Sequence, residues 1–96
     1  MTLTDAELSL KVHMEVCPDL YADYATDLGR AMEAALKVAW NVDVQAPDSD
    51  PMCRVKLLLR RPSTPVVAFG STLARALCLA ALRASGVEVE DDEEGA

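Results

Sequence analysis

The spacing of apolar residues changes twice along this chain of 96 residues. From residue 28 to residue 39 they recur every three to four positions, as on one side of an α-helix. In WNVDVQ, residues 40–45, they alternate with polar residues, as in a strand with one buried face. Helical spacing returns after Gly70, in TLARALCLAALRAS. These changes predict an α+β fold in one domain.

Two more segments have the spacing of strands. Residues 53–60 place Cys53, Val55, Leu57 and Leu59 on one face and Arg54, Lys56, Leu58 and Arg60 on the other. The third strand is VVAF, residues 66–69. The connections APDSDP and RPSTP are turn-rich, and short connections favour antiparallel neighbours. We therefore expect a three-stranded, mainly antiparallel sheet packed by two to three helices, in the order α-α-β-β-β-α.

The two N-terminal helices have recognisable start signals. Thr4 followed by Glu7 is a capping-box pattern, which predicts a short helix over residues 4–16. Asp23 or Thr26 can cap the second helix, and Asp27 would then favour the helix dipole from the first turn.

The last helix is predicted to begin at Ser71 and to end at Gly86, in the C′ position. It is apolar almost all round. Because a helix of a small domain usually has one face in water, we expect its leucines near the two arginines to be partly exposed. The sequence thus predicts a homodimer contact through Arg75, Leu79, Leu82 and Arg83. The domain would span residues 1–86, with a disordered acidic tail over 87–96.

Charge is unevenly distributed along the chain, whose formal net charge is -7. Residues 1–50 hold ten acids and three bases, and the tail VEVEDDEEGA adds six acids. Residues 51–86 hold no acid and six bases, which are Arg54, Lys56, Arg60, Arg61, Arg75 and Arg83. Three explanations stay open: mutual screening, an acidic tail that imitates a nucleic-acid backbone, or a basic strip that binds phosphate or an acidic protein.

The sequence lacks the common catalytic and cofactor motifs. It has no nucleophile elbow, phosphate-binding loop, dinucleotide fingerprint, zinc-protease or EF-hand pattern. His13 is the single histidine, and the three cysteines are far apart with no CxxC pair. We therefore expect no enzyme activity, no metal and no cofactor. No segment has the length of a membrane span or the features of a signal peptide, which predicts a cytoplasmic protein.

Two stretches carry a family resemblance. Tyr24, Ala25, Thr26 and Asp27 open the second helix, and residues 71–82 form an Ala- and Leu-rich helix after Gly and Ser. Over roughly residues 20–85 the chain resembles small bacteriophage proteins of the phage ABA-sandwich domain family. The resemblance implies a phage or prophage origin and helices on both faces of the sheet, which would also cover Leu58. The family carries no settled activity, so it implies no site residues.

The order of elements also resembles a double-stranded RNA-binding domain. Such domains place lysines at the start of the last helix, where this chain reads GSTLARAL with only Arg75. The acidic tail would also repel RNA. RNA binding is therefore not favoured.

These observations predict a small acidic phage protein that binds and inhibits a bacterial host factor. The partner would be a protein of the host cell, such as a nucleic-acid-binding complex, and an anti-defence or anti-CRISPR role fits. The acidic contact residues would be Asp19, Asp23, Asp27, Asp91, Asp92, Glu93 and Glu94. The alternative is binding of nucleic acid or a phosphorylated ligand through Arg54, Lys56, Arg60 and Arg61. A minor virion or assembly protein is a third alternative.

Overall fold

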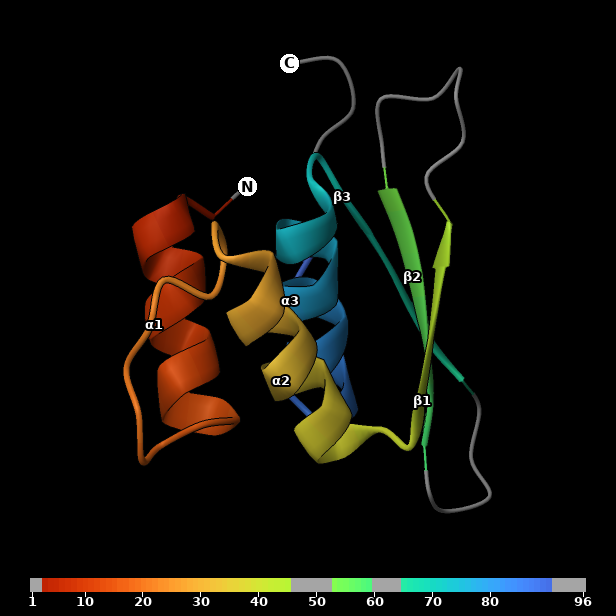
Figure 1. The fold of residues 1–96 in the computed structure, drawn as a ribbon, viewed down its shortest axis with the longest axis horizontal. Helices are drawn as coiled ribbons and strands as arrows, with labels where there is room; N and C mark the ends of the chain where they lie inside the picture. The colour runs from red at the N-terminus through yellow and green to blue at the C-terminus, as the bar shows by residue number, and fades with distance from the viewer. Residues whose placement is uncertain (1–2, 46–52, 60–64, 91–96) are drawn as a thin grey trace.

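The protein is described here from a computed structural model, which describes residues 3–45, 53–59 and 65–90. The elements follow the predicted order (Figure 1). They are α1 (Asp5–Glu15), α2 (Leu28–Val38), β1 (Asn41–Gln45), β2 (Cys53–Leu58), β3 (Val66–Gly70) and α3 (Leu73–Ala84). The α+β class and the α-α-β-β-β-α order are confirmed.

The three strands form one antiparallel sheet in the order β1-β2-β3. Its inner face carries the alternate apolar residues, with Val42 opposite Leu57 and Val55 opposite Ala68. α3 packs on the inner face against β2 and β3, and α2 approaches β1 from the same side (Figure 1). The expectation of helices on both faces is wrong for the described chain. Leu58, on the outer face, is accordingly half-buried with no helix over it.

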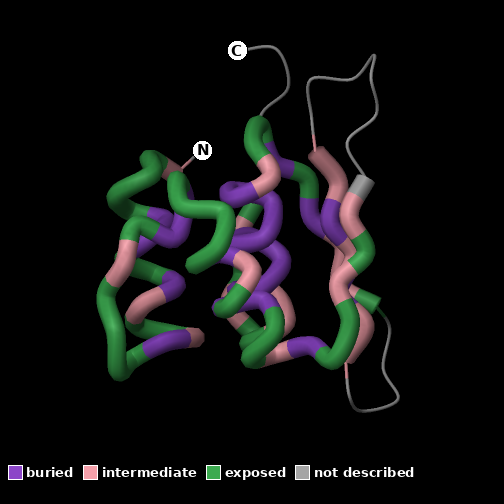
Figure 2. Tube along the Cα trace, in the orientation of Figure 1, coloured by how far each residue is buried: buried purple, intermediate pink, exposed green. Residues whose placement is uncertain are grey.

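α3 is the centre of the domain. The sheet packs against one side of it, α2 against another, and α1 against the side turned away from the sheet (Figure 2). Leu79 is 1% exposed and Leu82 is 0% exposed. The prediction that these leucines are exposed for a homodimer contact is therefore wrong. The reason is that α1 adds a layer over α3, so this helix has no broad face in water.

The predicted N-cap residue is confirmed for α1, but α2 and α3 have other N-cap residues than predicted. Thr4 and Glu7 form the predicted capping box of α1. α2 is capped by Asp27, whose Oδ1 accepts from the Arg30 N–H at 3.2 Å, since the predicted caps Asp23 and Thr26 form the preceding turn instead. α3 is capped by Thr72, not Ser71. α1 thus begins as predicted, whereas the caps of α2 and α3 lie one to four positions after the predicted residues.

The end of α3 has the conformation that its glycine predicts. Gly86 has φ of 89°, in the left-handed region. Its N–H donates to Arg83 O, and the Val87 N–H donates to Leu82 O at 3.0 Å. These two bonds form a Schellman motif, which turns the chain back along the helix.

The segment after Gly86 runs beside β3. Val87 and Val89 pack against the core. The Arg83 guanidinium donates to Val89 O and, at 2.7 Å, to Val67 O of β3. The first residues of the predicted tail thus pack with the domain, whereas Asp91, Asp92, Glu93 and Glu94 lie outside the described residues.

Candidate protein-binding surface

The loop between α1 and α2 is attached along α1. His13 Nδ1 donates to Cys17 O at 3.0 Å, and the Ala25 N–H donates to the Ser9 hydroxyl at 3.1 Å. The rings of His13 and Tyr21 meet edge to face, with their centroids 5.5 Å apart. Because the later loop residue contacts the earlier helix residue, the loop runs back antiparallel to α1 (Figure 1).

The loop also holds its own shape. Tyr24 is buried, and its hydroxyl donates to Leu20 O at 2.5 Å. Burial raises the pKa of Tyr24 to about 12, so the donor proton stays in place at neutral pH. The Leu20 N–H donates to Cys17 O, and the Asp27 N–H donates to Asp23 O at 2.8 Å. Such a compact loop presents its outward side chains in a fixed arrangement.

Those outward side chains are large and apolar. Leu20 is 48% exposed and Tyr21 is 50% exposed. On α1, Leu10 is 48% exposed and Met14 is 63% exposed, and helical spacing makes Leu10 a neighbour of both His13 and Met14. Since Tyr21 contacts His13, the helix and loop residues adjoin. We call Leu10, Met14, Leu20 and Tyr21 the α1–loop surface.

Acidic residues border this surface. Asp19 and Asp23 are exposed, and within the described chain neither forms an ion pair. Asp27 is exposed as well, but its carboxylate is engaged as the cap of α2. The structure therefore places the three predicted acids of the N-terminal half in one loop. Two of them carry negative charge beside exposed apolar side chains.

Two cations of the base-rich segment 51–86, both predicted for the dimer contact, have structural roles. Arg75 is 7% exposed, and its guanidinium lies 2.5 Å from Asp5 Oδ1 while also donating to Leu3 O. Arg83 joins β3 to the segment after α3. Both arginines were predicted to form a dimer contact. Each guanidinium instead forms hydrogen bonds within the domain.

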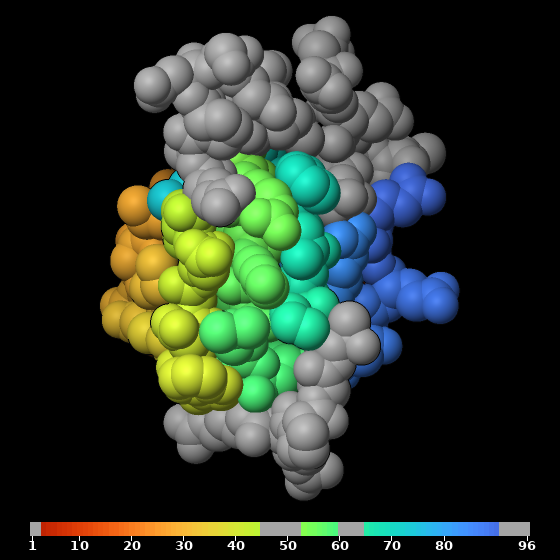
Figure 3. All heavy atoms as spheres, turned by 90° about the vertical axis from the view of Figure 1, so that its right-hand side faces the viewer, coloured from red at the N-terminus to blue at the C-terminus, as the bar shows by residue number. Residues whose placement is uncertain are grey.

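Arg54 and Lys56 alternate with the buried Val55 and Leu57 along β2, so they lie on the outer face of the sheet. Figure 3 shows this face, with β2 between β1 and β3. Arg54 is the ladder neighbour of Phe69, and Lys56 lies between Asp43 and Val67. Both cations are half-buried, whereas Phe69 is 38% exposed. Arg60 and Arg61 lie outside the described residues. The strip therefore has only two described members on an open surface.

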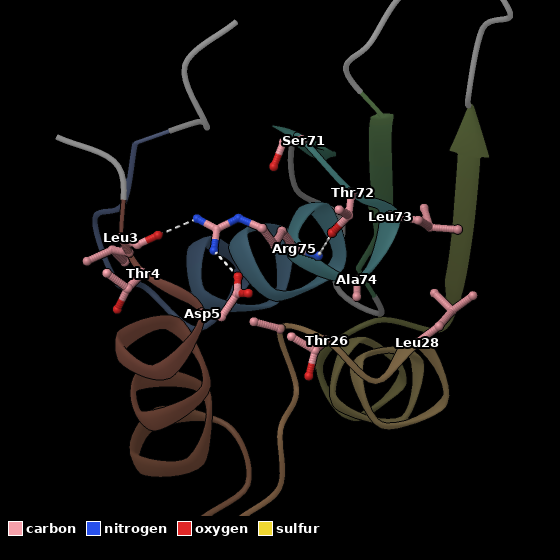
Figure 4. A pocket seen from close by; sticks show the side chains of 11 residues that line it. Leu3, Thr4, Asp5, Thr26, Leu28, Ser71, Thr72, Leu73, Ala74 and Arg75 are labelled. Carbon is pink, nitrogen blue, oxygen red and sulfur yellow. Dashed lines mark hydrogen bonds and ion pairs between the residues drawn. The ribbon is translucent and has the colours of Figure 1, made fainter. Parts of the chain in front are cut away.

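A hollow of about 690 Å³ lies at the start of α3 (Figure 4). Leu3, Thr4 and Asp5 line its α1 side, and Leu28 and Leu73 lie toward the strands. Its polar side chains are largely engaged: Thr4 and Thr72 cap helices, and Arg75 and Asp5 pair with each other. No group of three or more possible metal ligands occurs in the part of the chain that is described. The hollow could therefore hold a small molecule by its shape, but its described residues do not form a group of catalytic or metal-binding side chains.

The apolar half of the α1–loop surface was missed from the sequence. A signal for it exists in α1, where Leu8 and Val12 form the buried side and Leu10 and Met14 fall on another. The helix accordingly has apolar residues around most of its circumference. The side with Leu8 and Val12 covers the core, so the second apolar side, with Leu10 and Met14, indicates a surface that contacts another molecule.

Comparison with known proteins supports the fold. No family model and no curated protein sequence match this chain. The crystal structure of a phage protein from Bacillus cereus is similar, with a TM-score of 0.77, 15% sequence identity and 94% of each chain covered. Membership of the phage ABA-sandwich family is not confirmed. Among the described residues, no helix is long and apolar enough to cross a membrane.

Proposed function

We propose that this chain is a small phage-encoded protein-binding module that inhibits a bacterial host factor by occupying a basic surface on it. The observation that carries the proposal is the α1–loop surface, with its exposed Leu20 and Tyr21 beside Asp19 and Asp23. Tyrosine is enriched among residues that dominate binding energy. A loop already held by hydrogen bonds loses less entropy when it binds. The similarity in fold to a phage protein supports the proposed origin.

The charge layout supports a basic partner. Residues 3–45 contain eight acids and three bases, and the two cations of α3, Arg75 and Arg83, are bonded internally. The helical side of the domain therefore carries net negative charge, which steers association toward a positive groove. Nucleic-acid-handling proteins of bacterial defence, including CRISPR effectors, are partners of that chemistry. The module would act by occupancy and not by catalysis.

The test is a pull-down from nuclease-treated bacterial lysate with surface variants of the full chain. Leu20→Glu and the double variant Asp19→Lys/Asp23→Lys should each lose the captured host protein. Leu36→Glu is the matched control, because Leu36 is 47% exposed against 48% for Leu20 but lies on α2. Asp27→Ser keeps a capping oxygen and removes the charge, so it should weaken capture without loosening α2.

The proposal depends on a difference between these variants. If wild type, Leu20→Glu and the lysine double variant capture the same protein equally well, the α1–loop surface is not the binding surface. Capture should also decline with added salt, since exposed charges are screened over about 10 Å at 0.1 M. Salt-insensitive capture would contradict the electrostatic part of the proposal.

One observation favours a second candidate function. The sheet register places Arg54 next to Phe69 on the outer face, and a cation beside an aromatic ring is typical of surfaces that bind single-stranded nucleic acid. In that case the pull-down would yield nucleic acid that nuclease removes. Binding to a labelled oligonucleotide would fall steeply with salt and would be lost in Arg54→Ala. This outcome would replace the inhibitor proposal.

A further inference from the structure

The two edges of the sheet differ in what lies beside them. At β3, the Arg83 guanidinium donates to Val67 O and to Val89 O, so a packed segment adjoins that edge. At β1, no described residue outside β2 forms a backbone hydrogen bond with the strand. An open edge usually carries lysine, proline or a covering element that prevents further pairing. β1 reads NVDVQ, with no proline and one charged residue, Asp43.

Exposed apolar side chains adjoin the open edge. Leu28 is 46% exposed, Leu36 is 47% exposed and Trp40 is 58% exposed. Leu28 and Leu36 lie about two helical turns apart on α2, which contacts β1, and Trp40 lies in the bend that joins α2 to β1. Val42 and Val44, on the inner face of β1, are half-buried. Helix and strand thus share an apolar strip on the inner side of the edge, which we call the edge strip (Leu28, Leu36, Trp40, Val42 and Val44).

We infer that β1 pairs antiparallel with β1 of a second copy of this chain, which joins the two sheets and brings the two edge strips together. The two-fold axis would pass through Val42. Asn41 then lies opposite the partner's Asp43, and Trp40 lies opposite the partner's Val44.

The sequence of the strand favours this register. A carboxylate opposite an amide forms a hydrogen bond, and the symmetry produces this pair twice. A register centred on Asp43 would oppose two like charges. A shift by one residue would turn the edge strips to opposite sides of the sheet.

The edge strip adds buried apolar area to a contact whose backbone ladder is short. The Trp40 N–H already donates to Leu58 O of β2 at 3.0 Å. The ladder between the two copies of β1 would therefore include few residues. A ladder of that length is marginal by itself. Burial of Leu36 and Trp40 from both copies adds apolar contact on the inner side. Because β3 adjoins a packed segment, association closes at two copies instead of continuing as a filament.

This interface is separate from the α1–loop surface. The two lie on different layers, the edge strip beside β1 and the α1–loop surface on the far side of α3 (Figure 1). It also replaces the dimer contact predicted on α3. One of the two proposals can therefore fail without the other.

The first test is sedimentation velocity of the full chain over a range of concentrations. We expect a reversible dimer for wild type and for Leu20→Glu, and a monomer for Leu36→Glu. Circular dichroism should show that both variants are folded, as expected for side chains that are nearly half exposed. A wild-type chain that stays monomeric throughout would overturn the inference. A dimer that persists unchanged in Leu36→Glu would overturn it as well, because the contact would then lie elsewhere.

The second test addresses the register. Asn41→Asp places a carboxylate opposite the partner's Asp43 twice per dimer, which should weaken the dimer roughly tenfold. Adding Asp43→Asn to that variant restores one amide and one carboxylate per pair, so affinity should return. Both residues are exposed, and neither change touches the core. Unchanged affinity in Asn41→Asp, or no recovery in the double variant, would refute the proposed register.

Discussion

Gly70, the last residue of β3, lies directly against the backbone of α3. A Cβ atom at this position would lie 2.5 Å from the Ala76 nitrogen and 2.8 Å from the Ala76 Cα. Both are backbone atoms of α3, so neither can rotate away. Positive φ occurs only at Gly86 within the described chain. The requirement for glycine at residue 70 is therefore steric and not conformational.

The cost of Gly70→Ala follows from that geometry. The helix would have to move away from the sheet by several tenths of an ångström, and such overpacking costs about 1–3 kcal/mol or more. With backbone against backbone we expect the upper end, about 3 kcal/mol. Since 1 kcal/mol shifts Tm by about 4–8 °C in a domain of this size, Tm should fall by roughly 12–24 °C.

Gly29→Ala is the matched control. Gly29 is exposed in the first turn of α2, and a Cβ there would lie 3.4 Å from Asp27 Oδ1, an ordinary contact. The same change of one hydrogen to methyl should therefore stabilise the helix by about 0.5–1 kcal/mol. Urea and thermal unfolding followed by circular dichroism measure both variants. A Gly70→Ala midpoint equal to that of wild type would refute the close approach of β3 and α3.

Three further predictions concern the caps, the buried ion pair and alkaline pH. Gly86→Ala should cost about 1 kcal/mol in urea unfolding and Gly86→Asn less, because asparagine tolerates the left-handed conformation better; equal costs would contradict this. Asp5→Ala should lower the free energy of unfolding by about 1–3 kcal/mol more than Arg75→Met does. Asp5→Ala leaves the buried Arg75 guanidinium without its carboxylate, whereas Arg75→Met leaves Asp5, which is 55% exposed to water. A larger loss in Arg75→Met would refute the description of Arg75 as the buried member of the ion pair. Burial raises the pKa of Cys78 from 9.0 to about 12, and that of Tyr24 from 10.0 to about 12. The unfolded chain then loses these protons first, so stability should be complete below about pH 9 and fall between about pH 9 and 12, less steeply in Cys78→Ala.

Features with a local cause were predictable from the sequence. The order of elements follows from the change between helical and alternating spacing, which depends on neighbouring residues alone. The Thr4–Glu7 capping box and the Gly86 helix end are also local, since their hydrogen bonds join residues three to five positions apart. These predictions are confirmed, and each depends only on residues that are near one another in the sequence.

Features with a tertiary cause were not predictable. Leu79 and Leu82 were expected in water because the sequence does not reveal that α1 packs over α3. Trp40 was expected on a half-buried face, yet it is 58% exposed at the sheet edge. Asp19 and Asp23 were predicted as contact residues. Their apolar neighbours were not, because the return path of the loop along α1 depends on contacts such as Ala25 with Ser9.

The composition of the core links the two proposed surfaces. Alanine occupies half of the buried apolar positions, so α2 and α3 pack closely and the core needs few large side chains. Yet among the described residues eight large apolar side chains are exposed, and seven of them fall in the α1–loop surface or the edge strip. Folding alone would favour the large residues inside, because burying one contributes roughly 1.5–3 kcal/mol. Their placement outside, at two separate sites, is what the two proposed contacts require, one with a host protein and one with a second copy.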